Sequence, residues 1–231
     1  MRHLLASIAQ RLRLPIVCAL CNQYHRGNLA ICAGCHQHLL PVGHACYHCA
    51  LPLPNSTFSI CGHCIKQKPY VDEAIAAYRF EEPLRTLLHE FKYREGLYLS
   101  SFLASLMLSA QRSSTLSTEC LIPVPMHPKR LRQRGFNQAA ELTKHLAKAL
   151  NIPYGLAHCT KHINTLPQAK LNAHLRQQNL RNAFQTKPLP FKHITLIDDL
   201  ITTGSTVNEL AKSFKEQGVL RVDVWACARA T

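Results

Sequence analysis

Residues 194–206 read ITLIDDLITTGST, and this stretch decides the fold that we expect. The apolar run at its start is typical of a buried strand, which would deliver the adjacent carboxylates of Asp198 and Asp199 to its carboxyl end. A turn of small hydroxyl residues around Gly204 follows, and a helix is expected over residues 207–217. Because backbone N–H groups at a helix start converge on negative charge, the stretch predicts an anion site.

The turn and the acidic pair supply the candidate ligand-binding residues. Backbone N–H groups and hydroxyls of the turn would hold a phosphate, and Gly204 permits an approach that a side chain would block. The two carboxylates would accept hydrogen bonds from vicinal ribose hydroxyls, since they would repel a phosphate that they faced. The alternative is an ordinary capped helix, although a cap needs only one such residue. The candidates are Asp198, Asp199, Thr202, Thr203, Gly204, Ser205 and Thr206.

Strands and helices alternate around this stretch, which predicts an α/β fold with a parallel sheet flanked by helices. Strands are expected over residues 74–80, 120–124, 194–197 and 221–228. One helix is expected to open at residues 81–83, others to span 98–109 and 137–150, and Gly218 to end the helix over 207–217. Three isolated cysteines are expected to be buried, inert thiols, namely Cys120, Cys159 and Cys227.

Four CxxC pairs precede this region, separated by ten, ten and eleven residues. Two intervening residues let both sulfurs of a knuckle face one tetrahedral ion, so eight sulfurs make two structural sites. Zinc is the expected metal, although four thiolates also accept iron. Sequential pairing closes the shortest loops and is favoured, while crossed pairing stays open. The candidate ligands are Cys18, Cys21, Cys32 and Cys35, followed by Cys46, Cys49, Cys61 and Cys64.

Composition divides the chain near residue 68. The first 68 residues contain six Lys or Arg and seven His but no Asp or Glu, and the first acidic residue is Asp72. We therefore expect a double zinc-ribbon module over residues 1–68 and an α/β domain over 69–231. Three histidines of the module, His44, His48 and His63, are surplus to two complete tetrahedra and are expected to be surface groups.

The amino terminus places Arg11 and Arg13 where a signal peptide would be apolar. No uncharged apolar run approaches the roughly 18 residues of a membrane span. Paired cysteines without an export signal point to metal binding in a reducing compartment. We therefore expect a cytoplasmic protein without a membrane span.

The charge balance favours a polyanionic partner. The 27 Lys and Arg exceed the 13 Asp and Glu, for a formal charge of +14. Two Zn²⁺ on eight thiolates lower this charge to about +10. The interval 142–197 contains eight Lys or Arg and no acidic residue. These features suit nucleic acid or phosphorylated ligands.

A basic loop is expected directly after the strand over 120–124, at the sheet edge where parallel α/β proteins bind ligands. Its candidate DNA-binding residues are Lys129, Arg130 and Arg132. Three aromatic residues of the zinc module, Tyr24, Tyr47 and Phe58, could stack on bases, which suits single-stranded DNA. The alternative is a solvated basic turn.

Residues 194–206 resemble the phosphoribosyl pyrophosphate loop of type I phosphoribosyltransferases. The chain as a whole resembles the ComF family of competence proteins, in the order of its CxxC module, VPMHPKRLRQRGFNQAAEL, TLPQAKLNAHLRQQNLRNAF and this loop. The resemblance covers nearly the whole chain. It implies a phosphoribosyltransferase-like domain that binds phosphoribosyl pyrophosphate, or a related nucleotide ligand, with Mg²⁺. It also implies binding of incoming single-stranded DNA in the cytoplasm, alongside other DNA-uptake proteins.

The same resemblance places Arg134 on the pyrophosphate side of the site and Arg176 in a hood loop. Relatives typically carry arginines just before Thr165, where this chain has Lys161, His162 and Asn164. The candidate catalytic residues are therefore Arg134, Lys161 and Arg176. A catalytic phosphoribosyltransferase is the alternative function, but the sequence reveals no acceptor pocket, and Trp225 is expected in the core.

Overall fold

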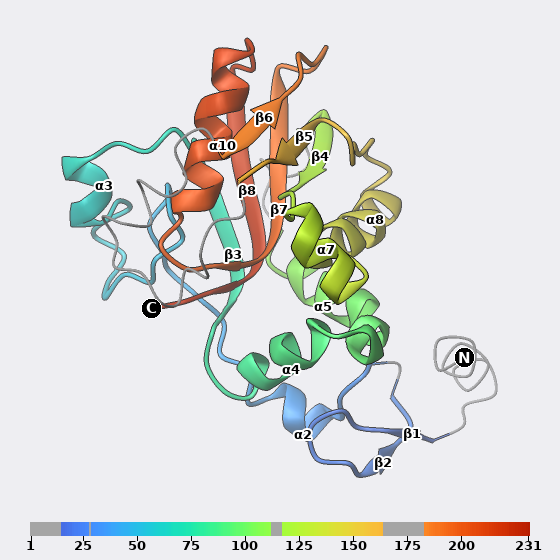
Figure 1. Cartoon of the computed structure of the whole chain (residues 1–231). Coiled ribbons are helices and arrows are strands. Elements are labelled where there is room, and N and C mark those ends of the chain that lie inside the picture. The colour runs from blue at the N-terminus through green and yellow to red at the C-terminus, as the bar shows by residue number, and fades with distance from the viewer. Residues whose placement is uncertain (1–14, 28, 112–116, 164–182) are drawn as a thin grey trace.

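The computed structural model describes residues 15–27, 29–111, 117–163 and 183–231. At its centre is a four-stranded sheet in the order β3-β8-β7-β4 (Figure 1). The strands are β3 (Ala74–Arg79), β4 (Cys120–Pro123), β7 (His193–Ile201) and β8 (Arg221–Arg229). All three strand pairs are parallel, which confirms the predicted α/β architecture.

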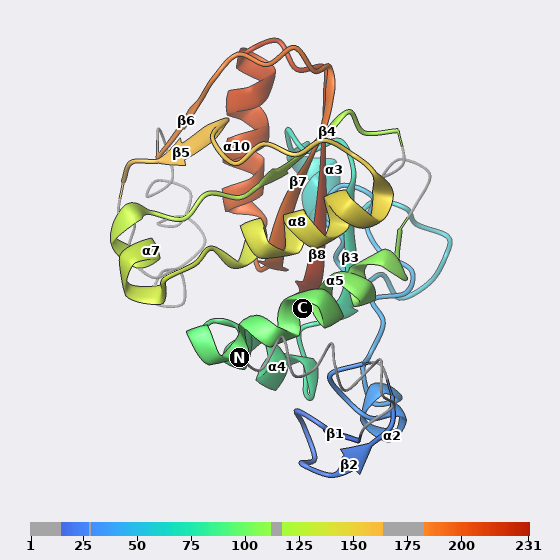
Figure 2. The same cartoon turned by 90° about the vertical axis from the view of Figure 1, so that its right-hand side faces the viewer.

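Helices cover both faces of the sheet (Figures 1 and 2). On one face lie α4 (Leu84–Phe91), the 3₁₀ helix η1 (Arg94–Leu99), α5 (Ser100–Leu108) and α8 (Gln138–Leu150). On the other lies α10 (Ser205–Glu216), beside the antiparallel pair of β5 (Cys159–Lys161) and β6 (Phe184–Thr186). Burial on both faces explains why the central strands are almost continuously apolar.

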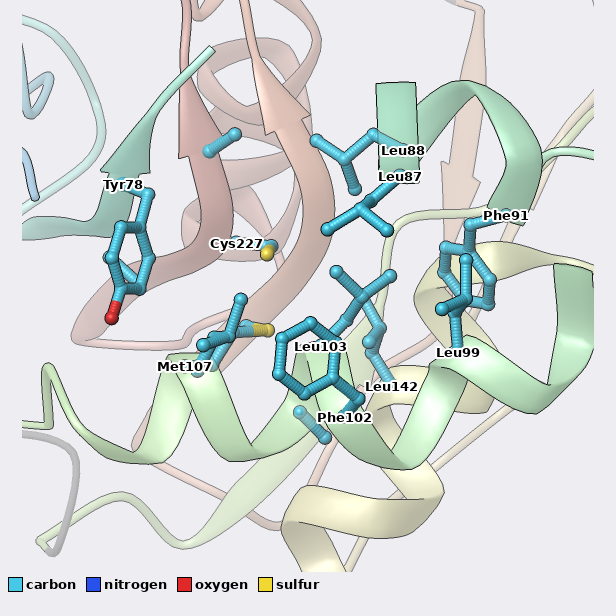
Figure 3. Packing of buried hydrophobic residues seen from close by; sticks show 14 of the residues in the cluster. Tyr78, Leu87, Leu88, Phe91, Leu99, Phe102, Leu103, Met107, Leu142 and Cys227 are labelled. Carbon is cyan, nitrogen blue, oxygen red and sulfur yellow. The ribbon is translucent and has the colours of Figure 1, made fainter. Parts of the chain in front are cut away.

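The main core lies between the sheet and α4, α5 and α8. Figure 3 shows leucine and phenylalanine side chains of α4 facing those of α5, with Cys227 of β8 beside them. Trp225 is fully buried in this cluster, as predicted. The three isolated cysteines are buried too, and burial raises the pKa of Cys120 to about 11 and that of Cys159 to about 12. These thiols stay protonated at neutral pH, as expected for inert core residues.

The amino-terminal part forms two small units. The first ribbon, residues 15–39, contains β1 (Ile16–Val17), β2 (Tyr24–His25) and α2 (Ala33–His36). It lies below α4 in Figure 1 and joins the main core through Cys18, Ile31 and Leu39. The second ribbon, residues 40–66, contains α3 (Gly62–Lys66) and lies along β3.

Backbone hydrogen bonds tie the second ribbon to the edge strand. Arg79 N donates to Leu40 O at 2.8 Å, Val42 N to Ala77 O at 3.1 Å, and Ala74 N to Tyr47 O at 2.8 Å. The ribbon thereby covers polar backbone groups that an edge strand would otherwise expose. Hydrophobic clusters cross residues 68 and 69, and the domain boundary proposed there stays a prediction.

The structure corrects two local expectations. The basic segment is not a loop but helix α7 (Pro128–Arg134), which begins with a proline at its first turn and ends at Gly135 with φ 85°. Proline at a helix start and glycine after its end are helix signals that the charge pattern obscured. The strand expected to end at Ile197 continues to Ile201, so Asp198 and Asp199 lie inside β7.

Candidate functional site

A cleft opens where β4 ends and β7 continues. The last contacts between these strands are the Pro123–Ile197 pair and a 2.9 Å hydrogen bond from Val124 N to Ile197 O. The chain then turns away into α7, while β7 continues beside β8 as far as the Ile201–Arg229 pair. The resulting cleft has a volume of ≈ 270 Å³ and lies at the carboxyl edge of the sheet, where open α/β folds bind ligands.

Six of the seven predicted ligand-binding residues line this cleft. The exception is Thr203, whose hydroxyl lies 2.9 Å from Ser205 Oγ and accepts from Ser205 N at 3.4 Å. The wall of β7 and α10 comprises Asp198, Asp199, Leu200, Ile201, Thr202, Gly204, Ser205, Thr206 and Val207. The facing wall comprises Lys92, Val124, Pro125, Met126, His127, Arg130, Arg134, Asn137, Gln138 and Lys161.

Gly204 forms the start of α10 and has a φ of 78°, which a residue with a side chain adopts only under strain. Ser205 and Thr206 follow in the first turn of the helix, which begins at Ser205 and not at residue 207 as the sequence predicted. The first N–H groups of a helix have no partner within it and favour a negative charge. The local geometry therefore favours a negative charge beside the start of α10.

The acidic pair lines the cleft. Asp199 N donates to Asp198 Oδ1 at 2.9 Å. Burial raises the pKa of Asp198 well above its ordinary value, and the charge of Asp199 raises it further, while Lys161 opposes the shift. Two adjacent carboxylates of this kind are stabilised in their charged forms by hydroxyl donors or a cation.

Lys161 provides a cation near the acidic pair. It ends β5, and its Nζ lies 5.4 Å from the ring centre of Phe184 on β6. Burial lowers the pKa of Lys161 to about 8; the charge of Arg130 adds to this effect and Asp198 opposes it. Lys161 is thus a cleft residue whose charge changes close to neutral pH.

Helix α7 contributes two arginines to the cleft. Arg134 Nη1 donates to Gln138 Oε1 at 3.0 Å, and burial, followed by the charge of Arg134, lowers the pKa of Arg130. The other two members of the predicted DNA-binding group, Lys129 and Arg132, are exposed and do not line the cleft. The structure therefore divides that group between two faces of one helix.

Among the cleft residues that sequence reasoning missed, two have basic side chains, Lys92 and His127. His127 Nδ1 accepts from Lys129 N at 3.2 Å at the start of α7, and its Nε2 lies 3.1 Å from His162 O. Its position before Pro128 was the available signal, because it caps a helix that was not expected. Lys92 follows α4, and no local pattern connects it with the cleft. The candidate Arg176 lies outside the described residues.

Away from the cleft, the cysteines form two clusters with sequential pairing, as favoured by the sequence. Within each cluster the sulfurs lie within 4.8 Å of one another. Cys21 and Cys32 Sγ are 3.8 Å apart in the first ribbon, and Cys49 and Cys61 Sγ are 3.7 Å apart in the second. A tetrahedron with Zn–S bonds of about 2.3 Å has edges of roughly 3.8 Å, so both clusters fit zinc.

Electrostatics within the clusters also favours a cation. Burial opposes ionisation of Cys18, but backbone N–H groups, including those of Cys32 and Leu20, lower its pKa to about 6. Burial and neighbouring thiols, Cys18 among them, raise the pKa of Cys35 to about 12. Four crowded thiols therefore need a metal ion to ionise together.

Two of the three histidines considered as surplus ligands contact backbone carbonyls. His44 Nε2 lies 2.6 Å from Phe58 O, and His48 Nδ1 lies 2.9 Å from Asp72 O. Both clusters consist of cysteines alone. In the part of the chain that the structure describes, none of the helices is long and apolar enough to cross a membrane.

Fold and site together define a class of protein: a parallel α/β domain with an anion-type cleft, joined to two four-cysteine ribbons. The family model described as "Double zinc ribbon domain" matches residues 9–65. The chain is 36% identical to "Competence protein F" of Haemophilus influenzae over 220 residues, which are 89% of this chain and 95% of the relative. The chain belongs to the ComF family of competence proteins.

Other relatives extend this relationship. The "DNA utilization protein YhgH" of Escherichia coli is 31% identical over 225 residues, covering 94% of this chain and 99% of the relative. The "Competence protein ComFC" of Bacillus subtilis is 25% identical over 205 residues, covering 81% and 79% respectively.

Proposed function

We propose that this protein acts in the cytoplasm in DNA uptake or utilization, and that its cleft binds phosphoribosyl pyrophosphate or a related nucleotide ligand. The names of the relatives support the biological role. The observation that carries the ligand assignment is the meeting, in one cleft, of the Gly204 turn, the carboxylates of Asp198 and Asp199, and the cations of Arg130, Arg134 and Lys161.

Each part of the cleft suits one part of such a ligand. The turn that begins α10 would hold the 5-phosphate, because its hydroxyls and N–H groups are donors. Asp198 and Asp199 would accept hydrogen bonds from the ribose hydroxyls, while Arg130 and Arg134 would face the pyrophosphate. This order separates the carboxylates from the phosphates, gives the carboxylates and the 5-phosphate hydrogen-bond donors, and places the arginines beside the pyrophosphate.

The cleft also fits Mg²⁺. Mg²⁺ is commonly held by one or two carboxylates together with substrate phosphates and water, and Asp198 and Asp199 are the carboxylates lining the cleft. When bound, the ion would neutralise the charge of a pyrophosphate group. Zinc, by contrast, belongs to the thiolates of the two ribbons.

Calorimetry tests the ligand assignment directly. Phosphoribosyl pyrophosphate should bind the full-length protein in the presence of Mg²⁺, more tightly than ribose 5-phosphate and more tightly than without Mg²⁺. Binding of neither compound at millimolar concentration would contradict the proposal. Equal affinity for both would show that the pyrophosphate contributes nothing and would exclude the proposed role of Arg130 and Arg134.

Single-stranded DNA is the proposed macromolecular partner, and other DNA-uptake proteins would act with it. Helix α7 presents Lys129 and Arg132 to solvent while its other two arginines line the cleft. In the ribbons, Tyr24 and Phe58 are 75% and 57% exposed, which suits stacking on bases. Tyr47 is less suited, because its hydroxyl donates to Glu73 Oε2 at 3.2 Å.

Catalytic phosphoribosyl transfer is the second candidate, and Lys161 favours it. Its pKa of about 8 allows it to exchange a proton near neutral pH, beside the acidic pair. In such a reaction the bond between ribose C1 and pyrophosphate breaks, a bond to an acceptor nitrogen forms, and the acceptor loses a proton. Pyrophosphate release that depends on an added base or amine would establish this activity; release without any acceptor would indicate hydrolysis instead.

A further inference from the structure

Arg229 is the last residue of β8. It joins the second ribbon to residues 201–204, the segment before α10 that we call the phosphate turn after its proposed role. Its side chain is buried, with 7% of the residue exposed. Nε donates to the carbonyl oxygen of Cys49 at 2.8 Å. Nη1 donates to the carbonyl oxygens of Thr202 and Ala230, and to that of Ile201 at 3.4 Å. One guanidinium thus contacts a metal-ligand residue and the residue that begins the turn.

The guanidinium of Arg229 is bonded by backbone carbonyl oxygens. Among the ion pairs of residues 15–27, 29–111, 117–163 and 183–231, none includes Arg229. A buried charge is costly unless its surroundings are oriented toward it, and here carbonyl dipoles supply that orientation. The planar fork of arginine can bond in two directions at once, which the single ammonium of lysine cannot do. The arrangement therefore depends on both sets of carbonyls staying in place.

The two ends of this link have different sources of order. Cys49 belongs to the second cysteine cluster, and the next residue, Ala50, has a left-handed φ of 56°. The direction of the Cys49 carbonyl is therefore set by the shape of the metal knuckle. Thr202 follows β7 and leads to Gly204, whose own φ is 78°. Beyond the Ile201–Arg229 pair, Ala230 N donates to Ile201 O at 2.9 Å, and the side chain of Arg229 adds its own bonds to the carbonyl oxygens of Ile201 and Thr202.

We infer that Arg229 is a positioning residue, which holds the phosphate turn in its binding conformation and makes that conformation depend on the second cysteine cluster. Coupling of this kind is reciprocal: order in the cluster favours ligand binding, and ligand binding favours the ordered cluster. The ligand part of this inference rests on the proposed function. The structural part, that Arg229 orders residues 201–204, does not.

The strand itself offers a matched control. Arg221, at the opposite end of β8, also connects the second ribbon with the sheet: its Nη2 donates to Glu73 Oε2 at 2.9 Å and to Tyr47 Oη at 3.5 Å. Its Nε donates to Asp223 Oδ2 at 3.0 Å. Arg221→Met therefore removes a comparable arginine bridge without touching the phosphate turn. It separates a loss of general stability from a loss of local positioning.

The experiment compares wild type, Arg229→Met, Arg229→Lys and Arg221→Met as full-length, zinc-loaded proteins. Amide hydrogen exchange over residues 198–206, thermal denaturation and zinc content are measured without ligand. Calorimetry with phosphoribosyl pyrophosphate and Mg²⁺ follows.

We expect Arg229→Met to exchange at least about tenfold faster over residues 201–204 and to bind the probe at least about tenfold more weakly. Arg229→Lys should recover stability but only part of the affinity, and Arg221→Met should keep wild-type exchange in the turn.

The outcomes separate this inference from the proposed function. Unchanged exchange over residues 201–204 in Arg229→Met would overturn the inference, whatever the probe does. Equal acceleration in Arg229→Met and Arg221→Met would also overturn it, because the effect would then be general. If wild type does not bind the probe, the proposed function fails, and the exchange measurement still decides the role of Arg229. If Arg229→Met does not fold, Arg229→Lys decides by the same exchange comparison.

Discussion

The two ribbons carry the same ligand pattern, yet they occupy different positions in the molecule. The first ribbon keeps one cysteine buried and leaves Cys21 exposed, and it meets the helical layer through a few apolar residues. The second ribbon buries three of its four cysteines and bonds to β3, to both ends of β8 through Tyr47 and Cys49 and, through Arg229, to residues 201 and 202. The difference teaches that a metal knuckle stabilises its own loop, whereas its influence elsewhere depends on the hydrogen bonds that join the ribbon to the sheet.

The sharpest test of this comparison replaces the fourth cysteine of each cluster. Wild type should carry two equivalents of zinc, and Cys35→Ser and Cys64→Ser should each lose one. We expect Cys64→Ser to lower the free energy of unfolding by about 4 kcal/mol or more, because the second ribbon also covers the edge of β3. Cys35→Ser should cost less. Elemental analysis and chemical denaturation measure both quantities.

Protein prepared without chelators that contained neither zinc nor iron would contradict the metal assignment. Equal losses of stability in the two variants would contradict the comparison, since they would show that integration with the sheet adds nothing to the second ribbon. Iron in place of zinc would leave the comparison standing and change only the metal.

A second prediction separates the cleft from the ribbons. Asp198→Asn combined with Asp199→Asn should weaken binding of phosphoribosyl pyrophosphate at least about 100-fold, because amides replace the two anionic acceptors. Zinc content should stay at two equivalents, since both residues lie in β7 and neither belongs to a cysteine cluster. Gly204→Val should act similarly through strain at φ 78°. Calorimetry with Mg²⁺ provides the measurement, and unchanged affinity would reduce the acidic pair to a structural feature.

The succession of strand, glycine turn and helix could be predicted from the sequence because its signals are local, and anion binding by the turn stays a prediction. An apolar strand, two acids and a glycine-centred hydroxyl turn occupy thirteen consecutive residues, so these residue types are seen together in the sequence. Sequential cysteine pairing was likewise favoured by short loops. The helical state of α7 was missed even though Pro128 and Gly135 mark its ends, because the segment between them is mostly basic and has no apolar stripe at helical spacing.

The rest of the site depends on contacts that no local pattern encodes. Arg229 and Cys49 are 180 residues apart in the chain, and their hydrogen bond exists only because the second ribbon folds back along β3 and β8. Lys92 enters the cleft from the end of α4. The basic residues of α7 lie on two different faces only because this segment is a helix. Each of these facts follows from tertiary packing, which sequence periodicity cannot supply.

The third prediction concerns pH. Lys161 is protonated below its pKa of about 8 and attracts an anionic ligand, and it loses that charge as the pH rises. Affinity for phosphoribosyl pyrophosphate should therefore weaken about fivefold between pH 7 and pH 9, while the ligand's phosphates stay ionised. In Lys161→Gln the affinity should be low and independent of pH over this range. In Lys161→Arg it should be high and equally independent of pH. A wild-type profile that Lys161→Gln leaves unchanged would assign the titration to another group.

The smallest expected effect concerns binding of DNA. It compares the two faces of α7, of which one lines the cleft and the other faces solvent. Lys129 and Arg132 face solvent, so replacing both by Gln should lower the slope of log affinity for single-stranded DNA against log salt by about 0.7 for each lost phosphate contact. Binding of phosphoribosyl pyrophosphate should stay within about twofold, because neither residue lines the cleft. Arg130→Gln should reverse this pattern, because it should weaken binding of the nucleotide ligand more than binding of DNA.

Fluorescence anisotropy with a labelled oligothymidylate, repeated at several salt concentrations, measures the slope. If the Lys129 and Arg132 variant keeps the wild-type slope, the outer face of α7 does not contact DNA, and the exposed aromatic residues of the ribbons become the surface to test.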